Sequence, residues 1–281
     1  MARSNVTEQS EVFDHEWRIF GTFVSGQKYR NTRYRMQNTG TSKTRKIYFL
    51  RLCGRVLVLL VAIVVYIFDR EQFSAAEGLN FFKKFSLLHV LWGLWIYDMV
   101  LQLIPVKAHI SIGSQKVFES LFRPIKERIN YKNLKQYIKD TTASAYKVMI
   151  MWIILTAVVS GLFLVGVIDT GIMVLLSTFF YVCDLICVLI WCPFRLIMKN
   201  KCCTTCRIFN WDHLMMFLPI VSLHSFYSWS LVIFAFIIWL IWEVCVFTYP
   251  ERFWENSNMA LRCSECTDKL CTQYCRKLRG K

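Results

Sequence analysis

Long apolar runs recur along this chain, and they constrain its fold more than any other feature. Most are close to the length of about 20 residues that an α-helix needs to cross a bilayer. The runs lie at about 50–68, 86–106, 148–168, 172–192, 208–224 and 226–247. The sequence therefore predicts an all-α, polytopic integral membrane protein with about six membrane segments. The fifth run is the shortest and contains Pro219, so we expect this segment to be short or re-entrant.

The charged residues predict the orientation of these segments. The chain carries a net charge of +15, and its Lys and Arg residues gather in both terminal regions and in two of the loops. The loop at 69–85 and the short Asp169–Gly171 connection, which we expect to be a tight turn, are not basic. Because cytosolic loops carry the excess of Lys and Arg, both termini are predicted to be cytosolic. We expect the plasma membrane to be the location.

Five regions follow from this pattern. Residues 1–49 form a basic cytosolic region with an expected interfacial helix, and 50–106 contain the first two spans. Residues 107–147 form a basic cytosolic loop, in which apolar residues from Val117 to Ile129 predict an amphipathic helix. Residues 148–193 form a membrane hairpin. Residues 194–281 contain a Cys-rich loop, the last hairpin and a Cys-rich cytosolic tail.

Two cysteine clusters at the ends of the last hairpin predict a small cytosolic metal knuckle. Each cluster contains Cys-x-x-Cys, a spacing that lets two thiolates from one turn bind the same metal ion, and four thiolates suit tetrahedral Zn²⁺. The predicted zinc ligands are Cys203, Cys206, Cys263 and Cys266, and the possible additional ligands are Cys202, Cys271 and Cys275. An iron–sulfur cluster or a dithiol relay is the alternative. Two further thiols, Cys183 and Cys187, are four residues apart in the fourth run, and we expect them to pack in the core.

Ionisable side chains inside the apolar runs are candidates for a functional site. A charged group in the bilayer core needs a partner and generally faces the interior of the helix bundle. These residues are His89, Asp98, Asp184, His224 and Glu243. They predict either a proton or cation path or hydrogen bonds that hold helices together. Arg51 and Arg55, near the start of the first run, are expected to extend towards cytosolic headgroups.

The partners predicted from the sequence are mainly lipids. Besides the bilayer itself, Lys28 to Arg35 alternate basic and aromatic residues, which favours anionic lipid headgroups over single-stranded RNA beside a membrane. The sequence therefore argues against nucleic acid as a partner, whereas a protein partner on the cytosolic face is compatible with it. No nucleotide-binding glycine loop, G-x-S-x-G or H-E-x-x-H motif is present, and no catalytic residue or reaction is predicted.

These observations predict a membrane protein with a structural zinc site that acts as a transporter subunit or as an accessory protein recruiting a partner. Two alternatives remain open at this point. One is a membrane redox protein that uses its cysteines as a cluster or dithiol relay. The other is a metal-ion or proton-coupled transporter that uses the acidic residues of its spans.

Overall fold

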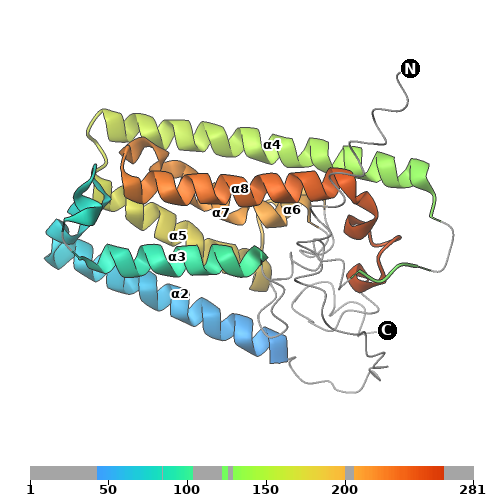
Figure 1. Cartoon of the computed structure of the whole chain (residues 1–281), viewed down its shortest axis with the longest axis horizontal. Coiled ribbons are helices and arrows are strands. Elements are labelled where there is room, and N and C mark those ends of the chain that lie inside the picture. The colour runs from blue at the N-terminus through green and yellow to red at the C-terminus, as the bar shows by residue number, and fades with distance from the viewer. Residues whose placement is uncertain (1–42, 84, 104–121, 126–128, 200–205, 263–281) are drawn as a thin grey trace. The chain divides into compact units, whose positions relative to one another are not determined.

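The computed structural model describes residues 43–83, 85–103, 122–125, 129–199 and 206–262, and this part of the chain is helical without strands. The long helices run roughly parallel to one another along the bundle in Figure 1. The α-helices are α2 (Lys43–Phe68), α3 (Leu87–Leu103), α4 (Tyr131–Leu164), α5 (Thr170–Leu189), α6 (Arg195–Met198), α7 (Asp212–Phe217) and α8 (Phe226–Thr248). The 3₁₀ helices are η1 (Arg70–Ala76), η2 (Asn80–Phe82), η6 (Arg207–Trp211), η7 (Leu218–Leu223), η8 (Pro250–Phe253) and η9 (Met259–Leu261).

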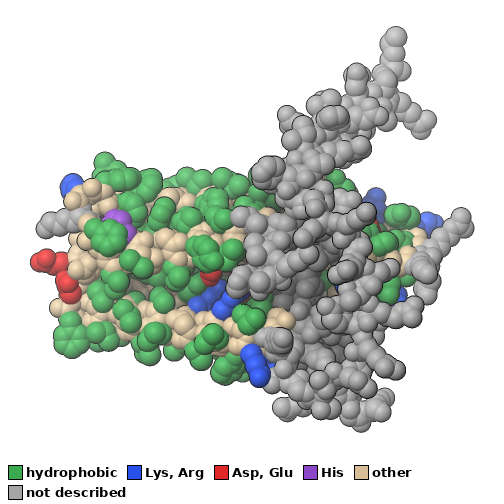
Figure 2. Space-filling view, turned by 60° about the horizontal axis from the view of Figure 1, so that its bottom comes forward, with side chains coloured by type: hydrophobic (Ala, Val, Ile, Leu, Met, Phe, Trp, Pro, Cys, Tyr) green, Lys and Arg blue, Asp and Glu red, His purple; other side chains and the backbone are tan. Residues whose placement is uncertain are grey.

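Four helices, α2, α4, α5 and α8, are long and apolar enough to cross a membrane, and α3 is a shorter apolar helix. Their outward faces carry large exposed apolar side chains, which Figure 2 shows as an extensive hydrophobic surface. Examples are Leu57, Leu60, Ile150, Ile154, Ile233 and Phe236. Contiguous apolar surface of this extent suits lipid rather than water. The predicted class, a helical membrane protein, therefore agrees with the fold.

Helix α4 begins well before the predicted span. The side chain of Asn130 caps its first turn by accepting hydrogen bonds from the backbone N–H groups of Lys132 and Asn133, at 3.1 and 3.3 Å. The helix has 34 residues, and at 1.5 Å per residue it is about 51 Å long. Its polar first half therefore extends beyond a hydrocarbon core of about 30 Å.

The connection between α4 and α5 differs from the predicted tight turn at Asp169–Gly171. The chain turns at residues 165–168, where Gly166 adopts a φ of +80° that glycine tolerates without strain. Asp169 is instead the N-cap of α5, and its carboxylate accepts a hydrogen bond from the backbone of Ile172 at 2.8 Å. Gly171 lies in the first turn of the helix.

The segment from Arg207 to Leu223 is a continuous run of helical turns, η6, α7 and η7, packed along α8. Arg207 and Trp211 bind Glu243 in the last third of α8, while His224 and Ser225 lead directly into its first turn. Eleven residues in 3₁₀ geometry and six in α geometry span about 31 Å. A uniform α-helix of the same length would span only about 25 Å. The 3₁₀ turns thus let a short segment run the depth of the bundle.

Most of this segment is buried, and it packs in one core with parts of α3, α4, α5 and α8. The largest fully buried side chains include Trp95 in α3, Trp211 and Phe217 in the segment, and Tyr227 and Trp242 in α8. Aromatic contacts connect them: the ring centroid of Trp95 lies 5.0 Å from Phe217 and 6.3 Å from Tyr227. Lipid-facing positions are therefore supplied mainly by the neighbouring long helices.

The connections lie at two ends of the bundle (Figure 1). We call the loop end the one with η1, η2 and residues 165–169, where Phe226 N donates to Gly78 O and Thr170 Oγ1 to Glu77 Oε1. We call the basic end the one where α2 and α4 begin and α3, α5 and α8 end. Here Tyr137 of α4 stacks on Trp254, with ring centroids 5.8 Å apart.

The predicted amphipathic helix over Val117–Ile129 is wrong where the structure describes it. Residues 122–125 are extended and run antiparallel to residues 257–259 at the basic end. Ile125 N donates to Ser257 O, and Met259 N donates to Arg123 O at 2.8 Å. Pro124 lacks a backbone N–H and disfavours a helical conformation for Arg123, which explains why helical periodicity is overridden here.

Candidate functional site

Three helices bring an arginine and two aspartates together inside the bundle. Arg55 of α2 donates from Nη1 to Oδ2 of Asp184 in α5 at 2.7 Å, and its Nη2 lies 3.2 Å from Oδ2 of Asp98 in α3. Nη1 also donates to the carbonyl oxygen of Tyr181 at 2.7 Å. Arg55 is thus bound within the protein, and the prediction that it extends towards lipid headgroups is wrong.

Tyr181 completes this group, which we call the Arg55 cluster: Arg55, Asp98, Tyr181 and Asp184. Its hydroxyl donates to Asp98 Oδ2, and the guanidinium carbon of Arg55 lies 3.8 Å from the centre of its ring. The side chains of Arg55, Asp98 and Asp184 are 12%, 23% and 19% exposed. Coulomb interactions are strong at such burial because little solvent screens them.

The Arg55 cluster contains one more acidic group than basic group. With both aspartates ionised, one guanidinium faces two carboxylates, and the cluster has a net charge of −1. A polar or charged group at membrane depth is energetically costly unless it is compensated. Uptake of one proton or one monovalent cation would neutralise the cluster.

A second polar group lies where α7 meets α3. Gln102 Nε2 donates to Oδ2 of Asp212 at 2.8 Å, and Nδ1 of His213 lies 3.2 Å from Oδ1 of Asp212. His213 Nδ1 and Asp212 Oδ1 are close enough for an ion pair but are not aligned for a hydrogen bond. Neither atom has a hydrogen-bond partner among the described residues. His213 is only 4% exposed. Its imidazole is therefore a buried group that can carry a proton beside a carboxylate.

Several buried polar atoms in this interior are free to bond further groups. Among the described residues, no hydrogen-bond partner is found for Trp95 Nε1, Gln102 Oε1, Ser177 Oγ, either ring nitrogen of His213, or Tyr227 OH. Most buried polar groups in proteins are satisfied, so each of these atoms is a candidate for a further hydrogen bond. The interior formed by α3, α5, α7 and α8 is therefore more polar than its aromatic packing indicates.

Glu243 belongs to a separate buried ion pair nearer the basic end. Its Oε2 accepts from Arg207 Nη2 at 2.5 Å, and its Oε1 accepts from Trp211 Nε1 at 2.8 Å. The two charged side chains are only 4% and 6% exposed. Glu243 therefore has a structural partner set that joins η6 to α8.

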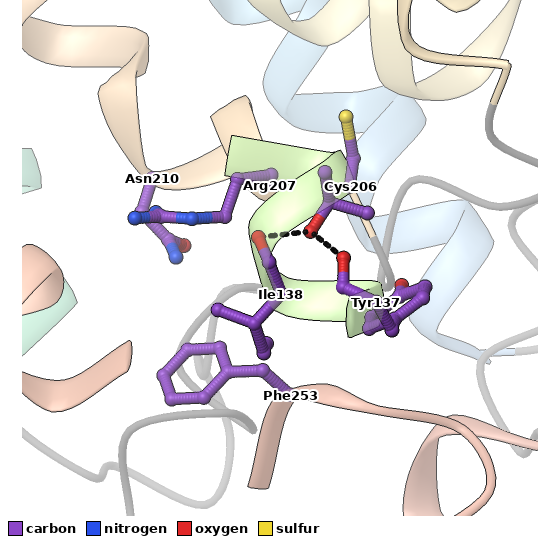
Figure 3. Close-up of a pocket in the computed structure, with 7 residues that line it drawn as sticks. Tyr137, Ile138, Cys206, Arg207, Asn210 and Phe253 are labelled. Carbon is purple, nitrogen blue, oxygen red and sulfur yellow. Dashed lines mark hydrogen bonds between the residues drawn. The ribbon is translucent and has the colours of Figure 1, made fainter. Parts of the chain in front are cut away.

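A small pocket beside this ion pair is lined by Cys206 and six other residues. Figure 3 shows Tyr137 and Ile138 from α4, Cys206 directly before η6, Arg207 and Asn210 from η6, and Phe253 from η8. Its internal volume of about 10 Å³ is enough for about one water molecule. The pocket is thus a packing defect of water size rather than a substrate site.

The two histidines predicted in the spans bind local backbone instead. His89 Nδ1 accepts from Ser86 N at 3.0 Å, and its Nε2 donates to Phe81 O at 2.6 Å, which secures η2 to the start of α3. Nδ1 of His224 lies 2.6 Å from Ser222 O, and the residue has a φ of +47° at the entry to α8. Both lie at the loop end and stabilise turns there.

Of the predicted zinc ligands, the structure describes only Cys206. The other cysteines of the two clusters, Cys202, Cys203, Cys263, Cys266, Cys271 and Cys275, lie outside the described residues, as do residues 28–35 with their predicted lipid contacts. Within the described part, no group of three or more His, Cys, Asp or Glu side chains is arranged to hold a metal ion. The zinc site remains a prediction.

Sequence reasoning identified Asp98, Asp184 and Glu243 but missed the residues that partner them. Arg55 was expected to extend towards headgroups. Arg207 directly precedes the fifth apolar run, and Asp212 and His213 lie within that run without being singled out. A usable signal was the number of charges: three acids in spans require basic partners at membrane depth.

The fold and site define a helical membrane protein with charged clusters in its interior. Compared with known proteins, the chain matches no family model, no curated protein and no solved structure at a significant level.

Proposed function

We propose that this protein is a membrane carrier that moves protons or small monovalent cations, with the Arg55 cluster as its ion-binding site. The observation that carries the proposal is the convergence of two carboxylates from different helices on a single guanidinium. This arrangement leaves one uncompensated negative charge that a cation can neutralise. A purely structural ion pair needs one carboxylate, so the second is the group assigned to transport.

Asp98 is the carboxylate that we assign to cation binding. Its contact with Arg55 is longer than that of Asp184, 3.2 Å against 2.7 Å, and it is the more exposed of the two. Asp184 serves as the permanent counterion of Arg55. The buried His213 and Asp212, together with the unpartnered polar atoms around them, supply further groups along the route.

The test is cation flux in liposomes that contain the purified full-length protein, measured with a pH-sensitive dye for protons and with ion-selective dyes for Na⁺ and K⁺. An imposed gradient should produce flux above that of protein-free liposomes. Asp98→Asn should reduce flux at least about tenfold, the scale of losing an ionised contact of about 1.4 kcal/mol or more. It should leave folding intact, because Arg55 keeps its bond to Asp184.

Asp140→Asn is the matched control, since Asp140 is an exposed carboxylate of α4 that hydrogen-bonds only Gln136 among the contacts described. It should transport at the wild-type rate. Flux that Asp98→Asn leaves unchanged would contradict the assignment of Asp98. Wild-type liposomes that conduct neither protons, Na⁺ nor K⁺ would contradict the carrier itself.

A second candidate function is a zinc-clamped accessory protein that recruits a partner at the basic end. The observation in its favour is that Cys206 and Phe253 line the same small pocket. The chain segments that lead into the two cysteine clusters therefore lie at one end of the bundle. We also propose that the chain crosses the membrane six times, with both termini in the cytosol, and that the protein lies in the plasma membrane.

A further inference from the structure

The end of α5 places two cysteine thiols in contact. After Leu189 the helix widens: both Ile190 N and Trp191 N donate to the carbonyl oxygen of Ile186, at 2.8 and 3.1 Å. The second of these bonds spans five residues rather than four. Pro193 then prevents the helix from continuing. This widened turn brings Cys192 back to Cys187, and their sulfur atoms hydrogen-bond each other.

The two thiols are chemically different. The Cys192 sulfur accepts the hydrogen bond from Cys187 and two more from the backbone N–H groups of Phe194 and Arg195. These three bonds outweigh desolvation and lower the pKa of Cys192 to about 7. Cys187 is the donor in the pair. Cys192 therefore has the character of an attacking thiolate, and Cys187 that of a resolving thiol.

Both side chains are partly exposed at the surface of the protein. Neither is buried, and both are reduced in this structure. Thiol–disulfide exchange needs an accessible thiolate and a second thiol within bonding reach. The end of α5 supplies both.

We propose that Cys187 and Cys192 form a redox-active dithiol that reduces a disulfide-bearing substrate and becomes an intramolecular disulfide. This inference is independent of the carrier function, because it uses neither the Arg55 cluster nor the predicted zinc ligands. It assigns a chemical role to Cys187, which the sequence predicted to pack in the core, and to Cys192 at the end of the same apolar run.

The exchange proceeds in two balanced steps. The Cys192 thiolate attacks one sulfur of the substrate disulfide, the substrate S–S bond breaks, and one substrate thiolate leaves with a mixed disulfide remaining on Cys192. Cys187 then loses its proton to the departing thiolate and attacks the Cys192 sulfur. The second substrate thiolate leaves and takes a proton from solvent. Two protein thiols are oxidised to one disulfide, and one substrate disulfide is reduced to two thiols.

Glutathione disulfide is the probe for the test, applied to the full-length, reduced protein in detergent. Trypsin cleaves after Lys147 and Arg195, and the peptide 148–195 contains the cysteines Cys183, Cys187 and Cys192. A Cys183→Ser background therefore leaves one possible disulfide in this peptide. After exposure and alkylation, mass spectrometry should find this peptide either fully alkylated or internally bridged, with the bridged form increasing with the glutathione disulfide concentration.

Two further variants in that background separate the roles of the thiols. Cys187→Ser should accumulate a glutathione adduct on Cys192, since the resolving thiol is missing. Cys192→Ser should accumulate at least about tenfold less adduct on Cys187, because that thiol is not activated. A peptide that stays fully alkylated in the parent protein would overturn the proposal, and so would equal adduct formation in the two variants.

Discussion

At the scale of single residues, the charged side chains inside the bundle are explained by their partners. Arg55 lies in the first half of α2, where an isolated helix would let it extend to headgroups. Asp184 and Asp98 lie on helices far away in the sequence, and their convergence keeps the guanidinium inside. Sequence reasoning could predict that the aspartates need partners, but a pairing over more than 40 residues depends on helix packing.

The Arg207–Glu243 pair predicts a large effect of removing one charge. Glu243→Gln leaves the guanidinium buried without its counterion, and breaking such a pair costs about 3–5 kcal/mol. We expect a markedly lower unfolding temperature in detergent, together with a change in tryptophan fluorescence because Trp211 loses a charged acceptor. Arg207→Met combined with Glu243→Leu should recover most of the loss. A single variant as stable as the wild type would contradict this assignment.

Cys192 predicts a pH dependence that can be measured directly. Its pKa of about 7 means that the thiolate, which is the reactive form, is present above this pH and is lost below it. The rate of its alkylation should therefore rise between pH 6 and 8, with a midpoint near 7. Cys187→Ala removes the largest cause of the lowered pKa, and the midpoint should move to higher pH. An unmoved midpoint would assign the effect to the backbone bonds alone.

At the scale of secondary-structure elements, hydrophobic periodicity predicted the long helices well, but it could not give their local geometry. The end of α2 and nearly the whole of α8 match their predicted bounds, since these runs are uniformly apolar. The fifth run, 208–224, was predicted to be short or re-entrant from its length and from Pro219; in the structure it is the Arg207–Leu223 segment. It spans the bundle depth through 3₁₀ turns, which tertiary packing along α8 selects rather than residue propensity.

The contact between α2 and α5 gives a prediction about Gly171. A methyl group on this residue would lie 2.5 Å from Cε2 of Tyr66, whose hydroxyl donates to Asp169 at 2.7 Å. Gly171→Ala should therefore displace Tyr66 and lower the free energy of unfolding by about 1–3 kcal/mol. Thermal unfolding in detergent measures this change.

Gly161→Ala is the matched control, because no atom lies within 4 Å of the added methyl group in α4. It should be neutral or stabilising by up to about 1 kcal/mol through helix propensity. Tyr66→Ala in the Gly171→Ala background should restore part of the lost stability. Equal effects of the two glycine substitutions would show that the close approach of Tyr66 is unimportant.

At the scale of the whole molecule, the long helices run in alternating directions between the loop end and the basic end. This alternation predicts which residues lie on the same side of a membrane. Leu79 and Val165 are exposed at the loop end, whereas Lys135 and Asn256 are exposed at the basic end. Single cysteines at these four positions, in a background without the twelve native cysteines, can be labelled with an impermeant reagent. Positions 79 and 165 should label from outside, and 135 and 256 only after permeabilisation. Labelling of 79 and 256 from one side would exclude a crossing by α8.

The predicted zinc clamp would join the two ends of the last hairpin. Cys206 and Phe253 line the same small pocket, so the described segments that lead towards the two cysteine clusters lie at the same end of the bundle. The purified protein should contain about one zinc ion per chain, lost in Cys206→Ser and retained in Cys271→Ser. Elemental analysis measures the content, and iron with sulfide instead would favour the redox alternative.

Zinc removal should have a restricted structural effect, which limited proteolysis can locate. Residues 249–262 are held without metal, because Asn258 pairs with Pro124, its Nδ2 donates to Arg252 O at 2.9 Å, and Trp254 stacks on Tyr137. A chelator or Cys206→Ser should therefore expose only the chain beyond Arg262 to trypsin, and Cys271→Ser should not. Cleavage at Arg252 as well would mean that the metal, rather than these contacts, holds the basic end together.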